Sequence, residues 1–343
     1  MTRPRDRIQS PQAGHGAGPL DILVAIFSDT AAWTIPAVRV DELRRRFPDA
    51  RFLHAESEAA MVRLMPTVEV AFTSRLTERA FDAAPALRWV HSPAAGVGSM
   101  LFPAMKASRV VLSNSRGMNA VAVAEHALML MLAALRRMPE ALRAQSERRW
   151  IANDLSGLPS LRGRSLLIAG LGAIGCELAR MASGLGMRVI GTRREIGEPL
   201  PEGVAEAYDP SALPALLPAA DVVVVAAPLT AETRGMIGAA ELALMKSSAW
   251  LVNVARGKLV DERSLILALE RRAIAGAALD VFEHEPLPVT SPLWSMPNVI
   301  VTPHVAGFRE DYWEAATDLF AANLRRYLAG EAVANIVDKR AGY

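Results

Sequence analysis

The chain of 343 residues is long enough for two domains, and its 51% hydrophobic and 22% charged residues are typical of a globular protein. A formal net charge of +2 offers no strongly basic surface for nucleic acid, so its local arginine clusters are interpreted as solvated faces. No apolar run reaches the length of a membrane span, and a single cysteine excludes an internal disulfide and favours a reducing compartment. We therefore expect a cytoplasmic protein that binds neither nucleic acid nor membrane.

Residues 1–19 are rich in Arg, Gly, Pro and Gln and lack the apolar core of a secretory signal, so they predict a disordered leader. Beyond the leader, apolar runs alternate with helical patterns. Strands are predicted at 21–27, 50–54, 68–72 and 87–91, and helices at 38–46 and 77–83. This alternation is typical of a small parallel α/β domain.

The middle of the chain begins with a long apolar helix, predicted at 119–137, followed by a helical segment at 140–150 and a loop at 151–164. A second α/β unit then starts. Its strands are predicted at 166–169, 188–191, 221–226, 250–253, 277–280 and 299–302, and its helices at 174–185, 211–217, 239–244 and 261–271. This pattern predicts a complete doubly wound sheet, and a last helix is expected at 312–328.

A glycine-rich turn follows the first strand of this second unit. Gly170, Gly172 and Gly175 stand in a G-x-G-x-x-G pattern, with Ala173 and Ile174 between the last two, directly before a helical segment. In such a motif the glycines permit a tight turn, a close approach to a pyrophosphate and close helix packing. The free N–H groups of the helix terminus attract phosphate. The context predicts a dinucleotide site, and Cys176 beside it is interpreted as a packing residue.

The end of the next strand bears on which dinucleotide is bound. An acidic residue usually holds the ribose hydroxyls there, but this chain has Thr192, Arg193 and Arg194. Guanidinium groups match a phosphate through paired, charge-assisted hydrogen bonds, which favours NADP over NAD. A surface arginine pair, with Glu195 on the ribose, remains the alternative.

Three later strand ends carry reactive side chains, namely Arg256, Glu285 and His304. Because the carboxyl ends of parallel strands share one edge of a sheet, we expect these residues near the nicotinamide. His304 can exchange a proton with a carbonyl oxygen, Glu285 can orient the imidazole, and Arg256 can bind a carboxylate. A zinc-protease interpretation of His284-Glu285 fails because Pro288 occupies the place of the second histidine, and no metal site is expected.

With these motifs the chain resembles the D-isomer-specific 2-hydroxyacid dehydrogenases over nearly everything after the leader. The segments that carry the resemblance are 170–175, 228–233, 253–257, 280–286 and 302–307. The resemblance implies that Arg256, Glu285 and His304 are catalytic and that Ala95, Gly96 and Val97 hold the substrate carboxylate. It places Pro228, Thr233, Val254, Ala255, Arg256 and His304 along the cofactor and Asp280 on its carboxamide. Gly98 departs from the aspartate that the family often has, whereas Thr192-Arg193-Arg194 is similar to NADP-using reductases.

The resemblance also implies two Rossmann-like or flavodoxin-like doubly wound domains with a cleft between them. Residues 20–115 and 310–343 would form the substrate domain and residues 116–309 the dinucleotide-binding domain. Family members are usually homodimers, and the apolar helix at 119–137 fits such an interface. Glu125 and His126 on this helix are expected to be structural.

We therefore expect an enzyme that reduces a small 2-oxo acid to its D-2-hydroxy acid with NADPH or NADH, and catalyses the reverse. Glyoxylate and hydroxypyruvate are the preferred substrates by analogy with NADP-using relatives. The alternatives are a non-catalytic dinucleotide-sensing module of the same fold and a phosphoglycerate dehydrogenase-like enzyme.

Overall fold

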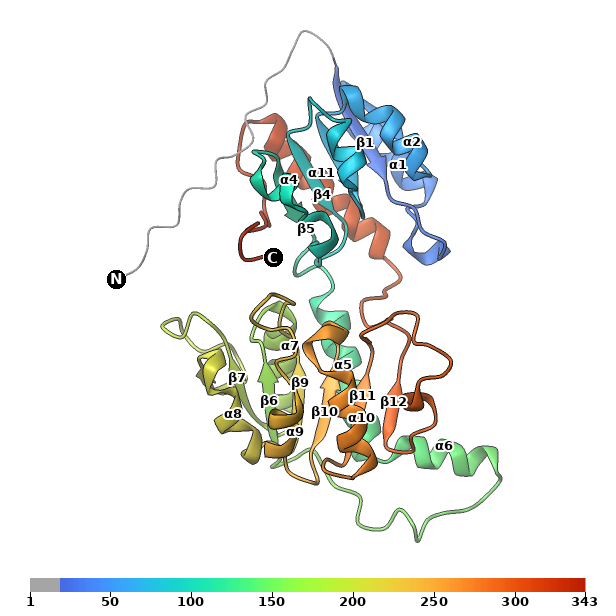
Figure 1. Cartoon of the computed structure of the whole chain (residues 1–343), viewed down its shortest axis with the longest axis vertical. Coiled ribbons are helices and arrows are strands. Elements are labelled where there is room, and N and C mark those ends of the chain that lie inside the picture. Colours follow the sequence, from blue (N-terminus) through green and yellow to red (C-terminus); the bar gives the residue numbers. More distant parts are fainter. Residues whose placement is uncertain (1–18, 343) are drawn as a thin grey trace. The chain divides into compact units, whose positions relative to one another are not determined.

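The computed structural model describes residues 19–342, which form two compact units (Figure 1). Unit 1 ends at Met118 and resumes at Glu310, and unit 2 spans Asn119–Arg309. The predicted leader falls almost entirely on residues 1–18, which lie outside the described residues.

Unit 1 is built on a five-stranded parallel sheet in the order β2-β1-β3-β4-β5. The strands are β1 (Leu20–Ala25), β2 (Ala50–His54), β3 (Val70–Thr73), β4 (Trp89–Ser92) and β5 (Val111–Asn114). The helices are α1 (Ala37–Arg46), α2 (Glu58–Leu64), α3 (Glu78–Asp82), α4 (Pro103–Ala107) and α11 (Tyr312–Leu328). Every residue of β1, β3, β4 and β5 is buried, as expected when helices cover both faces of a parallel sheet.

The last helix, α11, belongs to unit 1 although the whole of unit 2 separates it in the sequence from β5. Phe320 of α11 stacks on Phe72 of β3 with ring centroids 4.4 Å apart, and Trp89 of β4 stacks on Tyr327 at 5.4 Å. These aromatic contacts bury one face of the sheet under α11. Because α11 begins at Tyr312 and Trp313, this packing also fixes where these two side chains lie in unit 1.

Unit 2 is built on a seven-stranded parallel sheet in the order β12-β11-β10-β9-β6-β7-β8. The strands are β6 (Ser165–Ala169), β7 (Arg188–Thr192), β8 (Val204–Tyr208), β9 (Val222–Val225), β10 (Trp250–Asn253), β11 (Gly276–Leu279) and β12 (Val299–Val301). The helices are α5 (Ala120–Leu135), α6 (Met138–Ser146), α7 (Ala173–Gly184), α8 (Leu213–Leu216), α9 (Ala239–Leu244) and α10 (Glu262–Glu270). The direction of winding reverses between β6 and β9, the switch point at which such sheets bind dinucleotides.

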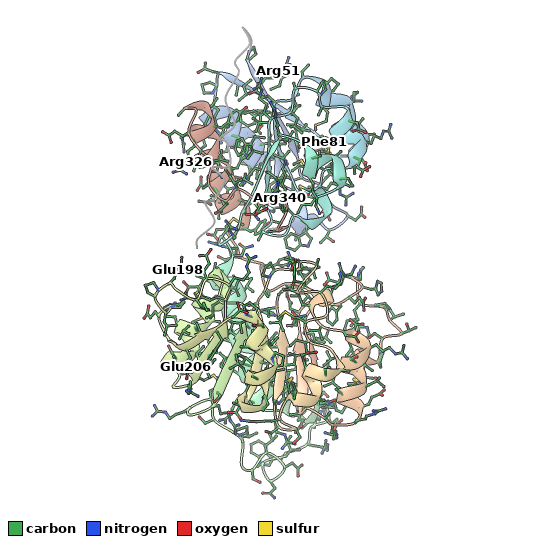
Figure 2. The ribbon with its side chains drawn as sticks, turned by 60° about the vertical axis from the view of Figure 1, so that its left-hand side comes forward. Arg51, Phe81, Glu198, Glu206, Arg326 and Arg340 are labelled. Carbon is green, nitrogen blue, oxygen red and sulfur yellow. The ribbon has the colours of Figure 1, made fainter. Side chains whose placement is uncertain are left out.

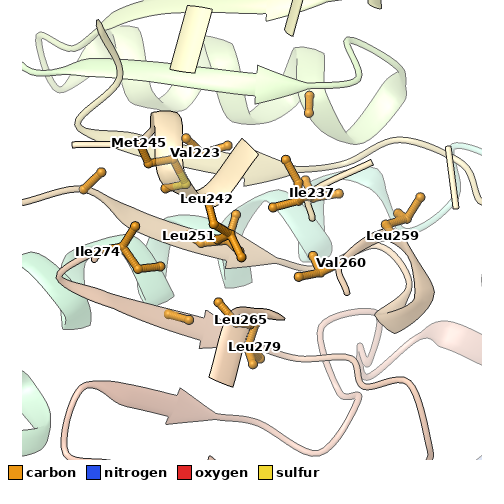
Figure 3. Close-up of a cluster of buried hydrophobic side chains, with 14 of the residues drawn as sticks. Val223, Ile237, Leu242, Met245, Leu251, Leu259, Val260, Leu265, Ile274 and Leu279 are labelled. Carbon is orange, nitrogen blue, oxygen red and sulfur yellow. The ribbon is translucent and has the colours of Figure 1, made fainter. Parts of the chain in front are cut away.

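Helices cover both faces of this second sheet. On one face α5 packs against α7, with Ala124, Ala127 and Leu178 buried between them and the strands. On the other face Leu242 of α9 and Leu265 of α10 pack against the central strands (Figure 3). Within residues 19–342, no helix has both the length and the apolar character that a membrane span requires.

The predicted doubly wound α/β class is confirmed, but several expected elements differ. The segment predicted as a helix at 140–150 begins at Met138, because Pro139 fits the first turn, and ends at Ser146, shortly before Arg148 takes a positive φ. The helix predicted at 211–217 is α-helical only over α8, because Pro214 and Pro218 each lack a backbone donor and 3₁₀ turns flank it.

Candidate active site

The glycine turn after β6 takes the form that the motif requires. Gly170 has φ +114°, and a Cβ there would lie 2.7 Å from the backbone nitrogen of Ala227. A Cβ on Gly175 would lie 2.2 Å from the carbonyl oxygen of Gly170, so α7 packs too close to the turn for any side chain. Gly172 precedes the first residue of α7, and open space surrounds it where a Cβ would stand. The turn and the helix terminus therefore fit a pyrophosphate.

At the end of β7 the two arginines are in different environments. Arg193 donates through Nη2 to the carbonyl oxygens of Glu198 and Pro199, the latter at 3.1 Å, on the loop where Figure 2 labels Glu198. Its Nε is buried and has no hydrogen-bond partner among the described residues. Arg194 is exposed, and Thr192 is buried. An orphaned guanidinium donor beside the glycine turn fits an additional phosphate.

Cys176, on the first turn of α7, has the properties of a packing residue. Burial raises the pKa of its thiol, with a smaller opposing effect from Arg193. Its Sγ is 3.6 Å from the carbonyl oxygen of Leu171. A thiol that holds its proton is a poor nucleophile.

The loop segments after β9 and β10 hold the residues expected along the cofactor. The Thr233 hydroxyl donates to the carbonyl oxygen of Pro228 at 2.7 Å and closes the loop after β9. Val254 and Ala255 are buried directly after β10. Within the described ranges, no cluster of three or more His, Cys, Asp or Glu side chains is arranged to hold a metal ion.

His304 and Glu285, which lie 19 positions apart in the sequence, are paired. His304 Nδ1 is 2.6 Å from Glu285 Oε2, and the N–H of Phe282 donates to Glu285 Oε1 at 2.9 Å. Burial acts to raise the pKa of Glu285, but these hydrogen bonds and the nearby cations outweigh it, so the pKa lies below its usual value. An ionised Glu285 fixes the imidazole orientation and leaves Nε2, which no described residue bonds, for proton exchange.

The backbone around His304 is held by the carboxylate of Asp280. Oδ1 accepts from the hydroxyl of Thr302 at 2.6 Å and from the N–H of Val305 at 3.0 Å, and Oδ2 accepts from the N–H of Ala306 at 3.0 Å. His304 itself has φ +54°, an uncommon conformation for a residue with a Cβ. The hydrogen bonds of Asp280 therefore fix the conformation of this loop. The expected contact between Asp280 and the carboxamide of the nicotinamide would use the acceptor capacity that its carboxylate has left.

His126 on α5 joins the same hydrogen-bond network. Its Nε2 lies 2.9 Å from the hydroxyl oxygen of Thr302 and 3.4 Å from Oδ1 of Asp280. Because Thr302 donates to Asp280, His126 donates to Thr302. The sequence indicated only a structural histidine, and the sole hint of this contact was a polar pair, Glu125 and His126, interrupting an apolar helix.

Arg256 stands on the loop after β10. Its Nη1 donates to the carbonyl oxygen of Ala255 at 2.6 Å, and Asn253 Nδ2 donates to the carbonyl oxygen of Arg256 at 3.0 Å. A Cβ on Gly257 would lie 1.9 Å from the carbonyl carbon of Phe282, so only glycine lets this loop meet the one that carries Glu285. Arg256 is exposed to solvent, but the protein around its guanidinium lowers its pKa by desolvation, and the Glu285 charge acts in the opposite direction. The three residues predicted to be catalytic therefore lie on adjacent loops of unit 2.

In unit 1, Ala95, Gly96 and Val97 follow β4. Ala95 and Gly96 are exposed, and none of the three N–H groups donates to another described residue. Asn114 donates through Nδ2 to the carbonyl oxygen of Ala95 at 2.7 Å and fixes the loop. Gly98, which stands where the family often has an aspartate, begins a 3₁₀ turn at Gly98–Met100. Such exposed amides suit a carboxylate.

Residues 128–306 match the family model described as D-isomer specific 2-hydroxyacid dehydrogenase, NAD binding domain. The chain belongs to this family. The dehydrogenase is 35% identical to a glyoxylate reductase of Thermococcus gammatolerans over 316 residues, which cover 89% of this chain and 94% of the relative.

Solved structures show the same likeness. A D-isomer specific 2-hydroxyacid dehydrogenase from Xanthobacter autotrophicus in complex with NADPH and MES is 32% identical, with a TM-score of 0.81, over 95% of this chain and 100% of the other. An NADPH-dependent glyoxylate/hydroxypyruvate reductase from Sinorhizobium meliloti in complex with NADP and sulfate is 28% identical, with a TM-score of 0.81, over 94% of this chain and 100% of the other.

The predicted family, enzyme class and nicotinamide dinucleotide cofactor are therefore confirmed for this dehydrogenase. The roles of its individual residues stay predictions.

Proposed function

We propose that unit 1 binds a 2-oxo acid and unit 2 binds NADPH, and that Arg256, Glu285 and His304 reduce the acid to its D-2-hydroxy acid. The pairing of His304 with an ionised Glu285 at 2.6 Å, on a loop held by Asp280, carries this proposal. It is the arrangement of a general acid with an orienting carboxylate. The pairing therefore favours an enzyme over a purely dinucleotide-sensing module.

The reduced nicotinamide, when bound, supplies the hydride that reaches the carbonyl carbon. His304 donates the proton from Nε2 to the carbonyl oxygen, and the two additions convert the carbonyl to a hydroxyl group. Arg256 binds the carboxylate and polarises the carbonyl, while the N–H groups of Ala95 and Gly96 hold the carboxylate. In oxidation the neutral imidazole takes the hydroxyl proton instead.

We also propose that NADP is preferred to NAD. Support comes from Arg193 and Arg194, which directly follow β7 at the position where an acidic residue usually holds the ribose, and from the unpartnered Nε of Arg193. Several neighbours of known structure were crystallised with NADPH or NADP.

The relatives' names favour glyoxylate and hydroxypyruvate as substrates to be tested first. A phosphoglycerate dehydrogenase-like activity is less favoured, because a glyoxylate reductase matches this chain over nearly the whole length of both.

The decisive experiment compares NADPH oxidation by the wild type, His304→Ala and His284→Ala with both acids. We expect His304→Ala to lose activity by about 10²–10⁴-fold, the range of general acid catalysis. His284→Ala is the matched control, because this exposed histidine lies one residue from Glu285 and outside the proposed machinery. Equal rates for the wild type and His304→Ala would refute the proposed mechanism.

We further propose a homodimer in which α5 contributes to the interface. Val121, Met129 and Leu132 of α5 are 49%, 46% and 37% exposed, which is unusual for large apolar side chains on one helix. We expect Met129→Glu to lower the mass measured by light scattering to that of the 36.9 kDa monomer. A wild-type protein that already runs as a monomer would contradict the proposal. The cytoplasmic location stays a prediction.

A further inference from the structure

Unit 1 contains a cavity of about 690 Å³ at the carboxyl ends of its central strands. Its walls come from the segments that directly follow β1, β3 and β4, at Ile26–Ser28, Ser74–Glu78 and Pro93–Ala94, and from the start of α11. Ligands of parallel α/β sheets bind at this end of the strands. A cavity of this size falls within the range of small-molecule sites, about 300–1,000 Å³.

Aromatic rings dominate the wall on the side of α11. Trp33 meets Tyr312 edge-to-face at 5.8 Å, and Tyr312 meets Trp313 edge-to-face at 4.9 Å. The Tyr312 hydroxyl donates to the carbonyl oxygen of Pro93 at 3.1 Å, so its polar end is already satisfied. Phe27 and Phe102 add rings from other segments. Such a wall favours edge-to-face or offset contact with another ring.

The charged groups of the cavity oppose one another. Arg75 and Glu78 both line it, and the Arg75 guanidinium lies 6.0 Å from the centre of the Phe27 ring. With one positive and one negative side chain, the lining offers no net charge to select an anionic side chain such as a phosphate ester. The cavity therefore suits an uncharged group.

The cavity adjoins the proposed carboxylate-binding loop. Ala94 lines it, and Ala95 and Gly96, with their undonated N–H groups, follow directly in the chain. An acid whose carboxylate binds these amides has its side chain beside the aromatic wall. This step rests on the proposed function of the loop.

Volume separates the possible acids. A cavity of about 690 Å³ lies in the upper half of the range for small-molecule sites, about 300–1,000 Å³. Glyoxylate has no side chain and would leave nearly all of that space to water against an apolar wall, whereas an aromatic side chain would displace much of it. We infer that this site prefers 2-oxo acids that carry an aromatic side chain, of the phenylpyruvate and 4-hydroxyphenylpyruvate type.

The test measures kcat/KM with NADPH for glyoxylate, hydroxypyruvate, phenylpyruvate and 4-hydroxyphenylpyruvate. We expect the aromatic acids to exceed glyoxylate by at least tenfold in the wild type. Trp313→Ala should lower the ratio of phenylpyruvate to glyoxylate by at least tenfold. Ser99→Trp, which adds bulk to the lining instead of removing it, should lower the same ratio. Trp150→Ala is the control, because Trp150 is 94% exposed and lies outside the cavity, and it should leave the ratio unchanged.

A second measurement does not depend on turnover. Binding of D-phenyllactate and D-lactate to His304→Ala with NADP⁺ is followed by calorimetry, and phenyllactate should bind at least tenfold more tightly. Reduction of glyoxylate with no preference for aromatic acids would overturn the inference while the proposed function stands. Absence of turnover with all four acids would overturn the proposed function, and the calorimetric comparison would still decide the inference. Equal affinity for the two hydroxy acids would overturn it.

Discussion

Replacing Glu285 by Gln tests the proposed chemistry most directly, because it removes a charge and keeps the shape. The amide oxygen of Gln can still accept a hydrogen bond from Nδ1 of His304, which is 2.6 Å from the carboxylate in the native protein. What is lost is the negative charge beside the imidazolium. The variant therefore separates orientation of the ring from stabilisation of its proton.

The size of the effect follows from that contact. Hydrogen bonds to charged groups contribute about 1.5–3 kcal/mol. Because the side chains of His304 and Glu285 are 43% and 34% exposed, solvent screens the pair and we take the lower end, about 1.5 kcal/mol. At about 1.4 kcal/mol per tenfold change in rate, the loss corresponds to about a tenfold change in kcat/KM.

The sign differs between the two directions of the reaction. Reduction needs the protonated imidazole, so the basic limb of its kcat/KM profile should move to lower pH in Glu285→Gln. Above that limb kcat/KM should fall about tenfold. Oxidation needs the neutral imidazole, so the acidic limb of its profile should also move to lower pH, and oxidation below that limb should gain relative to the wild type.

The state of Glu285 itself sets the range over which the comparison is valid. Its pKa is held below the ordinary value of 4.5, so its charge and the stability it contributes are fully present above that pH. Both are lost as the pH falls through the lowered pKa. The assay is steady-state NADPH oxidation and NADP⁺ reduction from pH 5.5 to 9. A uniform loss of kcat/KM with both limbs in place would refute the electrostatic role and leave Glu285 as a positioning residue.

Three further predictions concern cofactor choice and stability. Arg193→Ala should raise the KM for NADPH tenfold or more and the KM for NADH less than threefold, because a charged hydrogen bond to phosphate contributes about 1.5–3 kcal/mol. Arg188→Ala, at the other end of β7, is the control. Equal losses with both cofactors would contradict the phosphate role of Arg193. Gly257→Ala should lower the free energy of unfolding in urea by about 3 kcal/mol, since its Cβ would overlap Phe282. Gly184→Ala is the control and should leave this free energy unchanged, because nothing lies within 4 Å of the added Cβ. Equal stabilities of the two variants would show that the loop at Gly257 can move to accept the Cβ. Burial lowers the pKa of His91 from 6.5 to about 3. Below pH 6.5 the unfolded chain therefore binds a proton at His91 that the folded chain does not bind. The free energy of unfolding should fall by about 1.4 kcal/mol per pH unit below 6.5, or about 2 kcal/mol in total at pH 5. His91→Gln should remove this slope and His54→Gln should not, and an unchanged slope in His91→Gln would exclude His91 as its source.

Local signals in the sequence predicted most elements but not all of them. Continuous apolar runs placed β1, β9 and β10 within a few residues, because a strand buried on both faces carries mainly apolar side chains. The strand β8 was missed, because as an edge strand it pairs only with β7 and its Val-Ala-Glu-Ala-Tyr sequence has no such run. The helix α2 was missed although Ser57 accepts from the N–H of Ala60, a capping signal visible in the sequence.

For the site, local sequence signals were enough to locate the glycine turn, the strand-end residues and the pair of arginines. Each of these depends on local constraints, such as a Cβ that Gly175 cannot carry or a polar residue that follows a buried strand. Tertiary structure alone decided the contacts between distant segments. His126 reaches Thr302 across 176 positions, and the cavity of unit 1 joins residues 26–28 to Trp313 because α11 returns to cover the first sheet. Strand register and helix packing set such distances, and neither can be calculated from the spacing of residues along the chain.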